Sequence, residues 1–209
     1  MAKTKLGNLP RYALLALLLA VGTWLGLLLA AFSRTPAMAI RAYAANPSPV
    51  VPAALGGAFL RWSNFDRNSK VLGEQPLLHF ACANFGEAGS NREKALQVVR
   101  ILVARGAKLD SRYNGLTPLH EAVLYSANDK SVELVRALLS AGADPSLRIS
   151  RPGKQIDGLT APEFAEFLAL KRPAEMRETV QLLRMAASNN SFKVTPDGAP
   201  QLNLSLIHI

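Results

Sequence analysis

The stretch that decides the fold is "NGLTPLHEAV", residues Asn114 to Val123. A proline usually interrupts a helix, but at the first helical position its missing N–H has no intrahelical partner to lose. Thr117, just before Pro118, is a good N-cap because its hydroxyl can accept a hydrogen bond from a first-turn N–H. The Thr-Pro pair therefore predicts that a helix starts at Pro118.

The same pattern recurs along the chain, which indicates a repeat architecture. Three segments superpose without gaps: "QPLLHFACANF" at 75–85, "LTPLHEAVLYS" at 116–126 and "LTAPEFAEFLA" at 159–169. His79, His120 and Glu163 occupy matching positions in them. A second apolar helix is predicted after each, in "NREKALQVVRILVARGA", "KSVELVRALLSAGAD" and "AEMRETVQLLRMAAS".

These units resemble the ankyrin repeat. The second unit carries both family signatures, T-P-L-H-x-A and an apolar helix that ends in G-A-D. The first departs slightly, with "PLLHFA" and "VVRILVARGAKLD", and the third is partial, because Glu163 replaces His and no Gly-Ala follows. The resemblance covers residues 73–188 and implies an all-α, ankyrin-type helical repeat solenoid of about three repeats.

The repeats are longer than the family unit of about 33 residues. The spacing from His79 to His120 is 41 residues, and from His120 to Glu163 it is 43. The extra length is expected between paired helices and in a long finger, "DPSLRISRPGKQIDGLT". Long loops are tolerated because loop-closure entropy grows slowly with loop length.

Residues 12–32 form a run of 21 positions without a charge. A helix of about 20 residues, at about 1.5 Å per residue, crosses the hydrocarbon core of a membrane. We therefore expect one uncleaved N-terminal transmembrane helix. A cleavable signal peptide is the alternative, because "AMA" at Ala37 to Ala39 has a small-x-small pattern and cleavage there would leave a new N-terminus near Ile40.

The charges that flank this run suggest an orientation. Three cations lie in the basic tail 1–11, and two, Arg34 and Arg41, follow the run. The positive-inside rule then favours a cytoplasmic N-terminus and a repeat domain on the other side of the membrane. For a bacterium this predicts a single-pass inner-membrane protein whose repeats face the periplasm.

Residues 33–72 are expected to be a proline-rich linker. It contains four prolines: Pro36, Pro47, Pro49 and Pro52. Proline inside a helix removes a hydrogen bond and clashes with the preceding turn, so the segment predicts a spacer rather than a long helix. A short helix around Ala58 to Trp62 is expected to cap the first edge of the domain.

The charge distribution argues against nucleic acid as a partner. Residues 1–72 hold eight Lys/Arg and one Asp, residues 73–185 hold fifteen cations and thirteen acids, and residues 186–209 hold one of each. The net charges are +7, +2 and 0, which together give the +9 of the chain. A nucleic-acid binder should carry its positive charge on the folded domain, so the basic excess is better assigned to the flanks of the membrane helix.

No motif for catalysis, a cofactor or a metal is present. His120 is expected to be structural, since the resemblance implies that this histidine bonds neighbouring backbone and ties adjacent repeats together. Cys82, the only cysteine, stands three residues after His79, but it occupies a small apolar position that is typical of a core thiol. The sequence holds no glycine-rich phosphate loop, H-E-x-x-H or C-x-x-C pattern.

Candidate partner-binding residues follow from the resemblance. In ankyrin stacks the position after the motif histidine points to the concave face, and here it holds Phe80, Glu121 and Phe164. Two aromatic side chains on a solvated face would be binding anchors, unless the long loops cover them. The fingers add Arg112, Tyr113, Arg148, Arg151 and Lys154. These residues would grip an acidic partner or lipid headgroups, or would only keep the loops soluble.

Residues 189–209 are expected to be a disordered tail. The last six residues, Leu204 to Ile209, match the translation of a common transposase sequencing adaptor in one reading frame. We therefore interpret them as translated adaptor sequence at the end of a truncated gene fragment. The sequence as a whole predicts a membrane-tethered scaffold for another protein, without catalysis, cofactor or small-molecule substrate. The alternatives are a secreted soluble binder and the regulatory part of a longer enzyme.

Overall fold

A computed structural model describes residues 11–34, 36–45, 50–71, 74–86, 91–129 and 132–188. The basic N-terminal tail and the C-terminal tail, with its adaptor-like hexapeptide, lie outside the described residues. The repeat region and the apolar N-terminal run can therefore be compared with the expectations above.

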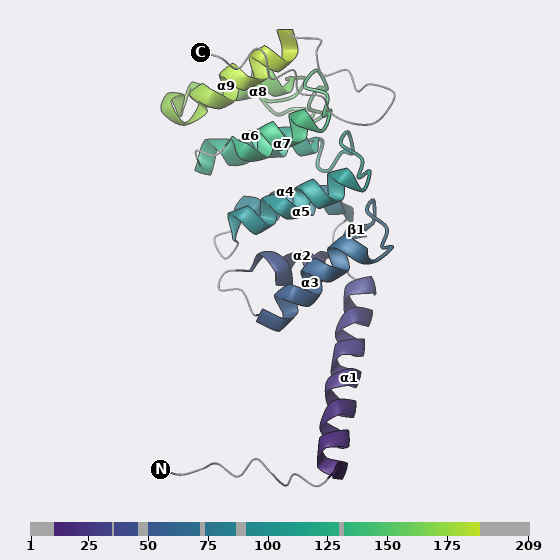
Figure 1. Cartoon of the computed structure of the whole chain (residues 1–209). Helices are drawn as coiled ribbons and strands as arrows, with labels where there is room; N and C mark the ends of the chain where they lie inside the picture. The colour runs from purple at the N-terminus through teal and green to yellow at the C-terminus, as the bar shows by residue number, and fades with distance from the viewer. Residues whose placement is uncertain are drawn as a thin grey trace, which may run out of the picture.

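The apolar run forms one long helix, α1 (Arg11–Arg34), which extends away from the rest of the molecule (Figure 1). Among the described helices, α1 alone is long and apolar enough to cross a membrane, over the segment Ala13–Phe32. The rest of the protein buries only the last residue of this segment, Phe32. The leucines of α1 are exposed, Leu27 by 71%. Because apolar surface of this extent is costly in water, it calls for a partner outside the repeats.

The other helices form four antiparallel pairs, stacked as layers beyond the C-terminal end of α1 (Figure 1). In chain order the pairs are α2 (Pro36–Ala44) with α3 (Val50–Trp62), α4 (Leu77–Gly86) with α5 (Arg92–Ala104), α6 (Pro118–Asp129) with α7 (Glu133–Ser140), and α8 (Ala161–Ala169) with α9 (Pro173–Ser188). The described strands are a two-residue antiparallel pair, β1 (Lys70–Val71) and β2 (Gln75–Pro76). The expected all-α repeat solenoid is confirmed.

The first layer differs from the expected spacer. Most of residues 36–62 is helical, and α2 packs on α3, α4 and α5. Pro36 begins α2 and Pro52 lies in the first turn of α3, where a proline sacrifices no intrahelical hydrogen bond. The short capping helix expected around Ala58 is the end of the longer α3.

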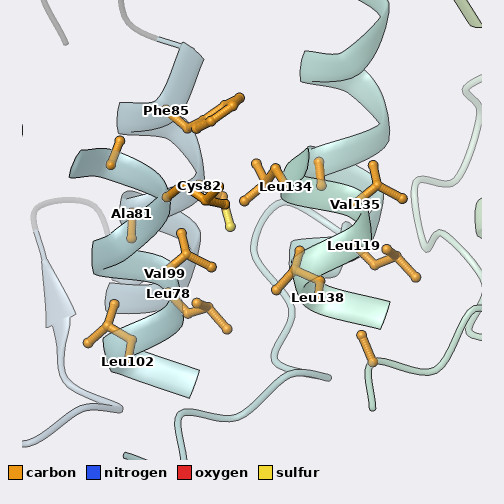
Figure 2. Close-up of a cluster of buried hydrophobic side chains, with 14 of the residues drawn as sticks. Leu78, Ala81, Cys82, Phe85, Val99, Leu102, Leu119, Leu134, Val135 and Leu138 are labelled. Carbon is orange, nitrogen blue, oxygen red and sulfur yellow. The ribbon is translucent and has the colours of Figure 1, made fainter. Parts of the chain in front are cut away.

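The core lies between successive layers, as the close-up of the α4–α5 and α6–α7 layers shows (Figure 2). Leu78, Cys82 and Val99 of one layer face Leu119 and Leu134 of the next. All five side chains are at most 2% exposed. Each helix pair thus buries its apolar face against a neighbouring layer, which is the construction principle of a solenoid.

Candidate protein-binding surface

Two loops between layers project on the same side of the stack (Figure 1). The first finger, residues 107–116, precedes α6, and the second finger, residues 144–160, precedes α8. The first finger ends in a tight turn, in which Tyr113 and Leu116 exchange backbone hydrogen bonds of 3.0 Å in both directions. These fingers contain all five finger residues expected from the sequence.

Hydrogen bonds join the two fingers to each other. The Arg112 guanidinium donates to the Arg148 carbonyl at 2.7 Å, and the Arg151 guanidinium donates to the Asn114 carbonyl. The backbone N–H of Ser150 donates to the Gly115 carbonyl at 2.9 Å. The fingers therefore form one braced edge rather than two independent loops.

Gly115 allows this close approach. Its φ is +75°, and a Cβ placed there would lie 1.9 Å from the Ser150 carbonyl oxygen. A side chain at this position would thus be strained by its backbone conformation and would also clash with the second finger.

The finger cations differ in what they contact. The guanidinium of Arg148 donates to the Gly158 carbonyl at 2.8 Å and lies 3.8 Å from the Glu163 carboxylate, with its side chain 66% exposed. Lys154 lies in the turn of the second finger and is exposed. Tyr113 is half-buried, with its ring edge-on to His79 at 5.9 Å. Lys154 and the outer part of Arg148 are therefore the cations most open to a partner.

The structure corrects the expectation for two of the three concave positions. Phe164 is 3% exposed and Glu121 is 7% exposed, so neither is a surface anchor, and Phe80 is half-buried. Each of the three contacts the preceding layer. Phe80 lies under the Arg41 guanidinium at 5.2 Å, and the Phe164 ring lies 6.3 Å from that of His120. The stacking of layers covers this position, because it lies over an element of the layer before it.

Glu121 makes the third of these contacts with a buried histidine. His79 Nδ1 lies 3.0 Å from Glu121 Oε2, with the two side chains 0% and 10% exposed. The other ring nitrogen, Nε2, donates to the Ser111 carbonyl at 2.9 Å. His79 thus links its own layer to the first finger and to α6, which is the tying role expected for the motif histidine. Burying a polar side chain costs less free energy when it has such partners.

His120 belongs to the capping structure of its own helix. Its Nδ1 lies 2.8 Å from the Thr117 hydroxyl, and its side chain is fully buried. Burial lowers the pKa of His120 from its ordinary 6.5 to about 4, and the Arg112 charge acts in the same direction, although the nearby Leu159 and Leu147 carbonyls oppose it. His120 is therefore neutral at physiological pH, as a structural histidine should be.

Glu163 replaces the motif histidine in the last repeat and caps α8. Its carboxylate accepts hydrogen bonds from the Thr160 backbone N–H at 2.7 Å and from the Thr160 hydroxyl at 2.8 Å. These bonds lower the pKa of Glu163. Thr160 and Glu163 form a capping box, so the departure from the family motif keeps the function of starting a helix.

The described residues offer no evident catalytic group. Cys82 is fully buried, and burial raises the pKa of its thiol well above the ordinary value, with the Glu121 charge acting in the same direction. A buried, protonated thiol is a poor nucleophile. Within the described ranges, no three or more His, Cys, Asp or Glu side chains gather as metal ligands would.

The layered helix pairs, the inter-layer fingers and the structural histidines define a helical repeat protein. The family model of ankyrin repeats matches residues 38–149 with three copies, which is more than half of the chain. The chain therefore belongs to the ankyrin repeat family. The match begins inside α2, which identifies the first helix pair as part of the repeat array.

A bacterial relative supports this assignment. An ankyrin repeat protein of Rickettsia felis is 41% identical over 81 residues, which cover 35% of this chain and 36% of that protein. The chain thus spans little more than a third of the length of the curated relative that it matches. No solved structure matches the chain.

One exposed aromatic residue was not among the residues expected from the sequence. Trp62, the last residue of α3, is 80% exposed. The exposure of Trp62 could have been inferred from the sequence, because it follows Arg61 at the end of an apolar segment that comes after the apolar run 12–32. The assignment of this region to a spacer concealed it.

Proposed function

We propose that the chain is a membrane-tethered scaffold that binds another protein along its two fingers. The observation that supports this most is the braced finger edge of an ankyrin-type stack. Ankyrin repeats indicate a protein–protein interaction module, and the fingers here are held in place before any partner arrives. Because a preorganised surface loses little conformational entropy on binding, rigidity at this edge favours recognition.

The partner surface is expected to be acidic where it meets the second finger. Lys154 and Arg148 are exposed cations at that edge, whereas Arg112 and Arg151 also brace the fingers. Charged residues at the rim of an interface mainly raise the association rate and set its specificity. We therefore place Lys154 at the contact and assign Arg112 and Arg151 a positioning role.

Site-specific photo-crosslinking in cells tests the finger edge. A benzoylphenylalanine at position 154 should yield a discrete adduct with one protein. Arg100 on α5 is the matched control, because it is also an exposed cation but lies on the second helix of its layer. The same probe at position 100 should give no such adduct. A specific adduct from position 100, with none from position 154, would contradict the proposal.

The membrane tether is proposed to be uncleaved α1, with a cytoplasmic N-terminus and with the repeats in the periplasm of a bacterium. The length and exposure of the apolar helix support a tether. Contacts of its C-terminal end with the stack support retention: Phe32 is 1% exposed, and its ring lies 5.8 Å from that of Phe59 in α3. A signal peptide would have no need of such a contact.

The alternative cleavage site lies inside a packed helix. Cleavage after Ala39 would remove the first four residues of α2, including the buried Pro36 and Ala39. It would also leave Gly56 of α3 facing a gap, since this glycine packs directly on the Ala39 carbonyl. These contacts favour the anchored form over a secreted binder with an N-terminus near Ile40.

No catalytic activity is proposed for the chain itself. The ankyrin repeat family is generally non-catalytic, and the buried Cys82 and the buried histidines serve the packing of the layers. The possibility that the repeats regulate an enzyme in a longer protein is the second candidate, and a continuous reading frame that joins them to a catalytic domain would favour it.

A further inference from the structure

The two ends of the repeat stack differ in character. The last layer, α8–α9, contains six charged residues, and α9 exposes Arg177, Glu178, Gln181 and Arg184. The first layer, α2–α3, contains only two charged residues, Arg41 and Arg61. End layers of solenoids need a polar outer face in water, because they lack a neighbour on one side. The first layer does not meet this requirement.

Apolar side chains are exposed on this first layer. Trp62 is 80% exposed, Met38 of α2 is 49% exposed, and Ala54 of α3 is also exposed. Tryptophan combines a large apolar ring with one N–H donor, and for this reason it is enriched where membrane hydrocarbon meets the lipid headgroups.

The point at which α1 joins the stack lies next to Trp62. Phe32, near the end of α1, packs on Phe59, which stacks on Phe65 with ring centroids 5.4 Å apart. Trp62 follows Phe59 by three residues, which is about 4.5 Å along a helix. Figure 1 shows the same arrangement, with the upper end of α1 beneath the first layer. A bilayer that holds α1 therefore has its surface close to Trp62.

Cations outnumber acids in the segment of chain that contains this point. Residues 34–71 hold five cations and one acid, Asp66. Arg61 and Arg67 are exposed, whereas the Lys70 ammonium is paired with Glu74 at 2.6 Å. Cations near a membrane surface are attracted to anionic lipids, by about 1 kcal/mol for each Lys or Arg.

We propose that the first layer rests on the bilayer surface beside α1, with Trp62 at the level of the lipid headgroups and Arg67 close to lipid phosphates. This inference rests on the proposed membrane tether. Such a contact would fix the orientation of the stack relative to the membrane, because two contacts with lipid, one through α1 and one through the α2–α3 layer, would restrict its tilt. The fingers would then be held at a constant height above the lipid.

Tryptophan fluorescence tests this contact on the full chain, which has two tryptophans, Trp24 and Trp62. The variant W24F leaves Trp62 as the only reporter, and W62F leaves Trp24 within α1. Both are reconstituted in phosphatidylcholine–phosphatidylglycerol vesicles that contain lipids brominated either near the headgroup or near the chain end. Trp62 should emit at blue-shifted wavelength and lose emission mainly with the shallow bromines. Trp24 should lose emission mainly with the deep ones.

The outcomes separate the inference from the tether on which it rests. One outcome is that the deep bromines quench Trp24, whereas Trp62 emits at red-shifted wavelength, is quenched by acrylamide in the water and is not quenched by bromine. This outcome would overturn the inference and leave the tether intact. Blue-shifted Trp62 emission without bromine quenching would mean that protein covers it, and this result would also overturn the inference. Absence of bromine quenching for both residues would overturn the tether itself.

A charge variant tests the role of the headgroups. In the W24F background, R67Q should reduce the gain in Trp62 quenching that phosphatidylglycerol gives over phosphatidylcholine alone. R177Q is the matched control, because Arg177 is an exposed arginine in the last layer. An equal loss in both variants, or no gain with phosphatidylglycerol in the parent, would contradict the electrostatic part of the proposal.

Discussion

At the scale of the residue, one repeat position joins each layer to the one before it. Phe80 contacts Arg41, Glu121 contacts His79, and Phe164 contacts His120. The first contact is an aromatic ring with a guanidinium, the second is a carboxylate with an imidazole, and the third is a phenyl ring with an imidazole. The same place in the repeat therefore serves the same packing purpose with different chemistry.

His120 gives this packing a dependence on pH. Its pKa is about 4 in the folded protein and near the ordinary 6.5 in the unfolded chain, so between these values the unfolded chain binds a proton that the folded protein does not. The free energy of unfolding should thus be unaffected by this group above pH 6.5 and should fall as the pH is lowered towards 4. The full loss corresponds to about 3 kcal/mol.

Urea unfolding of the chain in detergent, at about pH 7 and at about pH 4.5, measures this effect. The variant H120Q cannot take up the proton, so its stability should change less between the two conditions than that of the parent. The Gln amide can still bond the Thr117 hydroxyl, which limits the structural cost. Equal pH dependence in both proteins would show that His120 is not the group responsible.

At the scale of the element, the sequence predicted the layers that carry a motif histidine or its glutamate replacement, and it missed the layer that carries neither. The sequence "TPAMAI", residues 35–40, repeats the Thr-Pro pair of "TPLH", and α2 begins at its proline, but Met38 stands where His120 stands in the second unit. Without the histidine, the proline was interpreted as a breaker. Pro36, like Pro118, is the first residue of its helix, where its missing N–H has no intrahelical partner to lose.

The candidate site was predictable only in part. The finger residues follow from their place between repeats, because loops between stacked helix pairs must lie at the surface. The burial of Phe164 and Glu121 was not predictable, since it depends on which side chains of the preceding layer lie beneath them. The bonds of Arg112 and Arg151 across the fingers likewise join residues 36 and 37 positions apart in the chain.

Packing of α2 on α3 should depend on Gly56. A Cβ at this position would lie 2.7 Å from the Ala39 carbonyl oxygen, so G56A should force the two helices apart and lower the free energy of unfolding by about 1–3 kcal/mol. G22A is the control, because Gly22 of α1 has no atom within 4 Å of its added Cβ. Denaturant unfolding of both variants measures the difference. A G56A variant as stable as G22A would contradict this packing.

At the scale of the whole molecule, the repeats form a stack whose two end layers differ in their content of charged residues. One end has only two charged residues in its helix pair and carries a helix able to cross a membrane, while the helix pair at the other end has six. Between them the fingers form one braced edge. Of the net charge of +9, +7 lies before residue 73, on the side of the chain that carries α1 and the first layer. We propose that lipid contacts the end that carries α1 and that a protein binds the finger edge.

The membrane tether and the intact first layer are tested most directly by the mass and location of the tagged chain in cells, measured on membranes washed with alkaline carbonate. We expect the chain to stay in the membrane fraction and to retain the residues before Ile40, because α1 is an anchor and the first four of the nine residues of α2 lie before that point. A soluble chain that begins near Ile40 would contradict this expectation, since the tether and the intact first layer would both be absent.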